Sequence, residues 1–143
     1  MKIFDCFMYY DEDLVLDLRF NILFDHVDEF VIVESKFTHS GEKRKLLFDL
    51  KKYSKFKNKI NYIILDKEPD NLEIINTEDS EDKKNSKYIM NALKRENFQR
   101  NTIIKGLKSA NSEDLIIVSD VDEIPNLHEL NFKKVKISIK ITA

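Results

Sequence analysis

The sequence predicts an α/β protein with a mostly parallel sheet and helices on both of its faces. Four short apolar segments alternate with segments of helical periodicity along the 143 residues, a pattern typical of parallel strands joined by helical crossovers. Each apolar segment is nearly continuous, as expected for strands that are buried on both faces. A chain of this length buries roughly 68–70% of its unfolded surface, which is enough for a single domain with a substantial core.

The amino-terminal segment is predicted to form a strand followed by a helix. Ile3 to Tyr9 is short, aromatic and apolar, which is typical of a buried strand. Acidic residues at 11–13 favour a helix start, because carboxylates stabilise the positive end of a helix. We expect an amphipathic helix of about four turns, and its apolar stripe is predicted to pack on the sheet. Leu14, Leu18 and Ile22 recur at four-residue spacing, and the apolar residues beside them are Leu16, Phe20, Leu23 and Val27.

Two more strands are predicted in the middle of the chain. They span Phe30 to Ser35 and Ile60 to Leu65, and both are rich in residues that favour strands. Between them we expect a loop over 36–44, where threonine, serine and glycine interrupt the apolar pattern. We predict a helix over 46–57.

The remaining elements are a long helix and a fourth strand. The helix is predicted from Lys87 to Lys108 and the strand from Leu115 to Ser119. Beyond Pro125, residues 126–131 fit one helical turn, and residues 135–141 alternate like an edge strand. The apolar positions of the long helix that lie close to one stripe are Ile89, Leu93, Ile104 and Leu107.

Composition excludes several classes of function. A net charge of −2 gives no basic surface for nucleic acid. The only glycines, Gly41 and Gly106, lie too far apart for a dinucleotide-binding or Walker phosphate loop. Cys6 is the only cysteine and lies in an apolar run, so we interpret it as a core residue rather than a nucleophile.

The sequence shows no membrane-targeting segment. Asp5 interrupts the apolar start of the chain, so no signal peptide is recognisable. No stretch approaches the ~20 apolar residues that span a bilayer. We therefore predict a protein that is cytoplasmic or peripheral to a membrane.

The clearest chemical signal is an acidic cluster directly after the fourth strand. Asp120, Asp122 and Glu123 occur there, and parallel α/β sheets bind ligands at the carboxyl ends of their strands. In extended backbone, Asp120 and Asp122 project to the same side. Paired carboxylates suit Mg²⁺ or Mn²⁺, which would neutralise charge on a departing diphosphate. A solvent-facing acidic turn is the alternative, and the residues alone leave both interpretations open.

Four ordered blocks carry a resemblance to a known family. They comprise residues 4–12 with 18–23, residues 27–35 with the following Thr38 and Gly41, residues 95–101, and residues 117–125. In this order and spacing they resemble glycosyltransferase family 17, the β-1,4-mannosyl-glycoprotein N-acetylglucosaminyltransferase family. The resemblance covers the chain to about Leu127. It implies a GT-A-like (Rossmann-like) fold, a divalent cation and a UDP-linked donor, UDP-N-acetylglucosamine.

The resemblance also implies roles for particular residues. Asp120 and Asp122 match the metal and diphosphate-ribose motif of the family, with Asp122 as the direct metal ligand. Arg95 and Arg100 are expected to reach donor phosphates or, alternatively, to form structural pairs with neighbouring acids. Glu34 is expected to bind the uracil or ribose or to act as a structural turn acid. The full set of expected donor contacts is Asp5, Tyr9, Glu12, Glu34, Ser35, Arg95, Arg100, Asn101 and Asp120.

Other polar residues are interpreted more simply. We expect Arg19 to be structural because it lies within the first helix. His39 lies in a polar loop near the expected site and is a candidate contact to the sugar. His26 and His128 show no metal-ligand spacing and are interpreted as incidental surface residues.

The implied activity is metal-dependent transfer of N-acetylglucosamine, or a related sugar, from a UDP-sugar to a glycan acceptor. We assign residues 1–127 to the nucleotide-sugar-binding domain and 128–143 to a divergent tail. We expect the fold to be truncated after the Asp-x-Asp strand, without an identifiable base and without transferase activity in the chain alone. Two alternatives are a non-catalytic UDP-sugar or metal-binding remnant and another Mg²⁺-dependent enzyme, such as a phosphohydrolase. Animal members of the family are Golgi membrane proteins, whereas no anchor is visible here.

Overall fold

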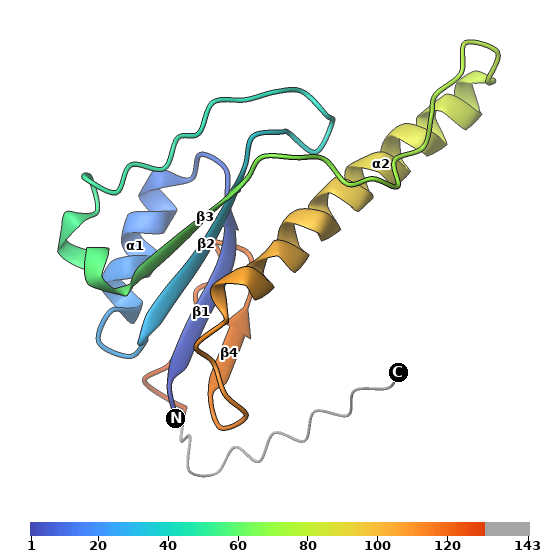
Figure 1. Ribbon diagram of the computed structural model, residues 1–143. Coiled ribbons are helices and arrows are strands. Elements are labelled where there is room, and N and C mark those ends of the chain that lie inside the picture. The colour runs from blue at the N-terminus through green and yellow to red at the C-terminus, as the bar shows by residue number, and fades with distance from the viewer. Residues whose placement is uncertain (131–143) are drawn as a thin grey trace.

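The computed structural model describes residues 1–130, and within them four strands form one parallel sheet. The order across the sheet is β3-β2-β1-β4 (Figure 1), and every neighbouring pair is parallel. The predicted α/β fold is therefore confirmed, and the strands occur where the apolar segments placed them. Their bounds are Ile3–Tyr9 for β1, Glu29–Ser35 for β2, Ile60–Leu65 for β3 and Leu115–Val118 for β4.

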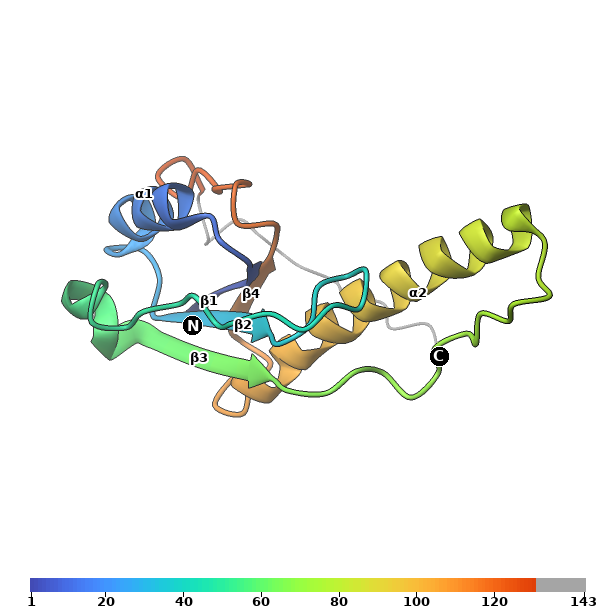
Figure 2. The ribbon, with the colours of Figure 1, turned by 90° about the horizontal axis from the view of Figure 1, so that it is seen from above.

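Helices cover both faces of the sheet, as predicted. Helix α1 (Asp13–Leu23) packs on one face, and the carboxyl-terminal end of α2 (Glu81–Asn101) lies on the opposite face with the 3₁₀ helix η2 (Thr102–Gly106) (Figure 2). In both views the amino-terminal part of α2 extends away from the sheet. No helix within residues 1–130 is long and apolar enough to cross a membrane.

The predicted buried stripe of α1 is wrong. Leu14 is 84% exposed, and Leu18 and Ile22 are exposed as well. The helix instead buries residues that were predicted to lie beside that stripe, namely Leu16, Phe20 and Leu23. Because each residue advances the helix by about 100°, the two apolar stripes lie on opposite sides and only one can face the sheet. On the buried side, the Phe20 ring packs against the rings of Phe30 in β2 and of Tyr53 and Phe56.

The predicted helix over 46–57 is also wrong. Residues 50–53 form a turn, and the only helical structure in the region is the 3₁₀ helix η1 (Ser54–Lys59). The backbone amides of Leu47 and Phe48 donate to the Glu34 carboxylate, at 2.7 and 3.1 Å. The buried Glu34 carboxylate of β2 thus bonds the backbone of this segment, and residues 44–49 form no regular element.

Helix α2 begins and ends earlier than predicted, and its apolar stripe is not buried. Ser80 caps it by accepting a hydrogen bond from the Lys83 amide, and Ile89 is 64% exposed. Its buried positions are amides: Asn91 exchanges two hydrogen bonds with the Glu73 backbone, at 2.7 and 2.9 Å. Polar side chains thus replace the expected apolar contact, because they satisfy backbone groups that run beside the helix. The other exposed members of the predicted stripe are Leu93 and Ile104.

Gly106 provides a test of the packing between η2 and the sheet. A Cβ at this position would overlap Cγ1 of Val31 and lie 3.0 Å from Cδ1 of Ile63. We expect Gly106→Ala to lower the free energy of unfolding by about 1–3 kcal/mol, since a packed core accommodates an extra methyl poorly. Urea unfolding would measure the change, with the exposed Lys105→Ala as the control from the same turn. Wild-type stability in the alanine variant would contradict this packing.

After Pro125 the described chain contains a turn at residues 127–128 rather than the predicted helical turn. Leu127 is buried against the α1 side of the sheet. The edge strand predicted at 135–141 lies outside the described residues.

Candidate functional site

A cavity of about 650 Å³ opens at the carboxyl ends of β1, β2 and the segment after β4. The chain runs outward from β1 to β2 and β3 and then returns to the other side of β1 with β4. This reversal makes the β1–β4 boundary a topological switch point, the place where open parallel sheets bind ligands. The volume is in the range of small-molecule sites.

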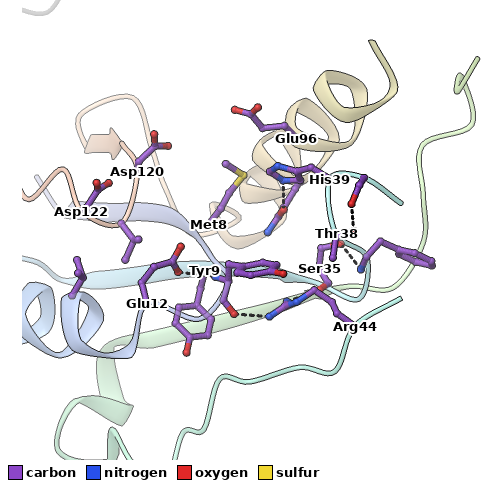
Figure 3. Close-up of a pocket in the computed structure, with 16 residues that line it drawn as sticks. Met8, Tyr9, Glu12, Ser35, Thr38, His39, Arg44, Glu96, Asp120 and Asp122 are labelled. Carbon is purple, nitrogen blue, oxygen red and sulfur yellow. Dashed lines mark hydrogen bonds between the residues drawn. The ribbon is translucent and has the colours of Figure 1, made fainter. Parts of the chain in front are cut away.

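The two predicted metal ligands face this cavity together. Asp120 and Asp122 both line it, on the side opposite Ser35 and His39 (Figure 3). Strand β4 ends at Val118, so a turn rather than strand pleating orients them. That turn is closed by hydrogen bonds from the amide of Glu123 to the Asp120 carbonyl and from the amide of Ile124 to the Asp122 carbonyl, at 3.0 and 3.1 Å.

The carboxylates of this turn suit a hard cation that takes only a few of its ligands from the protein. Within residues 1–130, no group of three or more His, Cys, Asp or Glu side chains is gathered for a metal. Mg²⁺ and similar ions are commonly held by one or two carboxylates, with water and substrate phosphate completing the shell. Asp120 and Asp122 fit that arrangement and do not fit an ion that requires an all-protein cage.

The end of β1 supplies an aromatic and acidic wall. Tyr9 lines the cavity, and its hydroxyl donates to Asp13 Oδ1 at 2.7 Å. Burial and this hydrogen bond raise the pKa of Tyr9 well above its usual value, so its hydroxyl stays protonated. Glu12 also lines the cavity, and its Oε2 accepts from the amides of Tyr10 and Asp11 at 2.9 and 3.1 Å. The wall is therefore held rigidly by local hydrogen bonds.

Arg44 joins the ends of β1 and β2 beneath the cavity. Its guanidinium donates to the Ser35 carbonyl at 2.9 Å and to the Tyr10 carbonyl, and it lies 4.3 Å from the centroid of the Tyr10 ring. It also pairs with Glu34 at 3.1 Å. Ser35 and Arg44 line the cavity, whereas Glu34 has no exposed surface.

The loop after β2 is fixed against α2 by two polar contacts. His39 Nε2 lies 3.2 Å from Gln99 Oε1, and the Gln99 amide nitrogen donates to the Val33 carbonyl at 3.0 Å. Arg95 donates to the His39 carbonyl at 3.2 Å. A Cβ on Gly41, whose φ is 97°, would lie 2.6 Å from Arg95 Nη2, so only glycine fits this turn.

The structure gathers about half of the expected site residues in one place. Of the expected donor and metal residues, those that line the cavity are Tyr9, Glu12, Ser35, Asp120 and Asp122. Arg95 pairs with Glu68 at 2.6 Å, Arg100 bridges Glu96 and Asp120, and neither they nor Asn101 line it.

Two expected donor contacts are corrected by burial. Asp5 has no exposed surface, and its carboxylate pairs with Arg19, which confirms the structural role of that arginine. Glu34 uses its carboxylate on the backbone at 47–48 and on the Tyr62 hydroxyl, at 2.7 Å. Asp5 lies within β1 and Glu34 near the end of β2, and both side chains point into the protein, where protein donors bind them.

A family model described as glycosyltransferase family 17 matches residues 1–139. The chain belongs to glycosyltransferase family 17. The matched range extends past Leu127, the predicted end of the nucleotide-sugar-binding domain. Searches among curated proteins and among solved structures gave no match. Membership in a glycosyltransferase family implies a sugar donor and a glycan acceptor.

Several residues that line the cavity of this glycosyltransferase domain were not singled out from the sequence. Arg44 is the clearest case, because it is one of only four arginines in a lysine-rich chain. The planar guanidinium that suits Arg95 and Arg100 to phosphate groups is present at Arg44 as well. The other lining residues that were given no individual role are Met8, Tyr10, Val15, Phe37, Thr38, Ser40, Glu96, Gln99 and Val121. Most of them lie within the blocks that carry the family resemblance.

The cysteine and two of the histidines lie outside the cavity lining. Cys6 has no exposed surface, and burial raises the pKa of its thiol to about 12, which confirms a core role. His26 and His128 come together, with their Nε2 atoms 3.3 Å apart. They therefore link the end of α1 to the segment that follows Pro125.

Proposed function

We propose that the cavity binds a UDP-sugar donor, UDP-N-acetylglucosamine or a related sugar nucleotide, together with Mn²⁺ or Mg²⁺. In this proposal the domain contributes the donor site for transfer of the sugar to a glycan acceptor. The observation that carries the proposal is the convergence of Asp120 and Asp122 with the ends of β1 and β2 in one cavity at the switch point.

The walls of the cavity suggest how such a donor would be held. Asp120 and Asp122 would hold the cation, which when bound supplies positive charge that stabilises a departing diphosphate. The ring of Tyr10, which is exposed at the cavity, offers an apolar surface for a base. On the opposite side Ser35, Thr38 and His39 offer hydroxyl and imidazole groups to ribose or sugar hydroxyls.

Isothermal titration with UDP tests the donor-site proposal. We expect one UDP per chain in the presence of Mn²⁺ and a loss of at least about tenfold in affinity when a chelator replaces the metal. Equal affinity with and without the chelator would refute the metal site. Failure of UDP and UDP-N-acetylglucosamine to bind with Mn²⁺ would refute the donor site itself.

Arg100 gives a prediction about charge at the metal site. Its Nη2 lies 3.3 Å from Asp120 Oδ1 and 3.0 Å from Glu96 Oε1, and the side chains are partly exposed. A cation beside a ligand carboxylate competes with the metal, but an exposed pair contributes only about 0–1 kcal/mol. We therefore expect Arg100→Gln to strengthen binding of free Mn²⁺ by up to about fivefold.

Electron paramagnetic resonance of free Mn²⁺ would measure this change. Arg100→Lys keeps the positive charge and serves as the matched control, with an affinity near that of the wild type. Weaker Mn²⁺ binding in Arg100→Gln would contradict the competition.

A further inference from the structure

Arg19 is an arginine enclosed entirely within the protein. It lies on α1, and its side chain has 0% exposure. Nε donates to Asp5 Oδ2 at 2.8 Å and Nη2 to Asp5 Oδ1 at 2.7 Å, so the pair is bidentate. Arginine is rarely buried to this extent, and a buried charge persists only where its partners satisfy it.

The remaining guanidinium hydrogens are donated to the acidic turn after β4. Nη1 donates to three backbone carbonyls, those of Asp120, Val121 and Glu123, at 2.7, 3.0 and 3.2 Å. Nη2 donates to Ser119 Oγ at 2.7 Å, and that hydroxyl donates in turn to the Glu123 carbonyl at 3.1 Å. One side chain on the first helix thus contacts four residues of the turn that follows the last strand.

We propose that Arg19 is a positioning residue, which shapes the turn at 119–123 so that Asp120 and Asp122 face the cavity. The role in ligand binding rests on the proposed function, since those acids are the proposed cation ligands. Carbonyl oxygens that converge inside a turn repel one another, and the buried guanidinium offsets that repulsion. With the carbonyls directed inward to Arg19, the two carboxylate side chains are directed to the cavity.

Asp5 serves this arrangement by fixing the plane of the guanidinium. A bidentate pair holds arginine in one orientation, which a single hydrogen bond would not do. Lysine could not substitute, because its ammonium has three donors on one atom and lacks the planar fork. The central strand β1 therefore sets the position of the metal-binding turn through Arg19, although β1 and the turn are more than 100 residues apart in sequence.

Hydrogen exchange of Arg19→Lys and Ser119→Ala tests the proposal. A purely structural role would raise exchange throughout the sheet in proportion to lost stability. A positioning role predicts that the amides of residues 119–124 exchange at least about tenfold faster than in the wild type. The β2 amides should exchange only as fast as global unfolding of the variant allows. We also expect affinity for UDP with Mn²⁺ to fall about 10–100-fold in Arg19→Lys.

Ser119→Ala removes one contact of Arg19 at the edge of the turn and should change the same quantities in the same direction, less strongly. If Arg19→Lys fails to fold, hydrogen exchange of Ser119→Ala tests the positioning role of Arg19. Wild-type exchange at 119–124 in the folded variants would overturn the role of Arg19, whatever the nucleotide does. If the wild-type chain binds no UDP with Mn²⁺, the proposed function fails by that result, and the exchange data still decide whether Arg19 positions the turn.

Discussion

Asp122→Ala is expected to weaken Mn²⁺-dependent UDP binding by at least about 100-fold while the fold persists. Removal of partners in the outer shell of a metal typically costs 10–100-fold, and loss of a direct ligand should cost no less. The side chain of Asp122 is exposed and lines the cavity, so its loss leaves no core void. Titration calorimetry with UDP and Mn²⁺ would measure the effect, and circular dichroism would confirm the fold.

The matched control for this variant is Asp70→Ala. Asp70 is an exposed acid that does not line the cavity, and its replacement changes the net charge by the same amount. We expect its UDP affinity to equal that of the wild type. Retention of full Mn²⁺-dependent binding in Asp122→Ala would rule out Asp122 as the direct metal ligand.

Phe20→Ala is expected to lower the free energy of unfolding by about 3–5 kcal/mol. The ring is fully buried, and its centroid lies 4.9, 5.2 and 5.1 Å from those of Phe30, Tyr53 and Phe56. Its removal leaves a cavity among these three rings, and a packed core relaxes only partly around such a cavity. Since whole domains are stable by about 5–15 kcal/mol, this variant should be close to unfolding. Urea unfolding followed by circular dichroism would measure it.

Leu14→Ala on the same helix is the control for Phe20→Ala. Leu14 is 84% exposed, so we expect a change within about 0.5 kcal/mol. The pair of variants measures which face of α1 packs on the sheet. A large loss in Leu14→Ala with a small loss in Phe20→Ala would mean that the helix buries the other stripe.

The strands could be predicted because their signal is local. Ile3–Tyr9 and Ile60–Leu65 are short, mainly apolar runs between polar segments, and the structure places strands at those bounds. Asp120 and Asp122 could be predicted to face the ligand-binding edge because they directly follow a strand of a parallel sheet, and both line the cavity there. Both inferences need only the order of residues and the rules of sheet geometry.

Two features could not be predicted: which face of α1 packs on the sheet, and whether an acid near a strand end faces the cavity or the core. Both depend on residues that are distant in sequence. Glu34 and Ser35 are adjacent at the end of β2, yet Ser35 lines the cavity and Glu34 is buried under the 47–48 backbone. Strand alternation separates them, but which of the two faces the ligand depends on what packs against the strand. The irregular backbone of residues 46–48, where the amides of Leu47 and Phe48 donate to Glu34, could not be predicted from the local pattern either.

The pairing of β1 with β4 has a consequence for how the domain assembles. Ile3 pairs with Leu115 and Cys6 with Val118, so β4 closes the longest loop in the sheet. Closure of a long loop costs conformational entropy, so the β1–β4 pairing is the one that the intervening chain opposes most. The acidic turn reaches the cavity only with β4, so a ligand held there should bind the complete sheet and not a state in which β4 is unpaired. Such a ligand would shift the equilibrium towards the complete sheet by mass action.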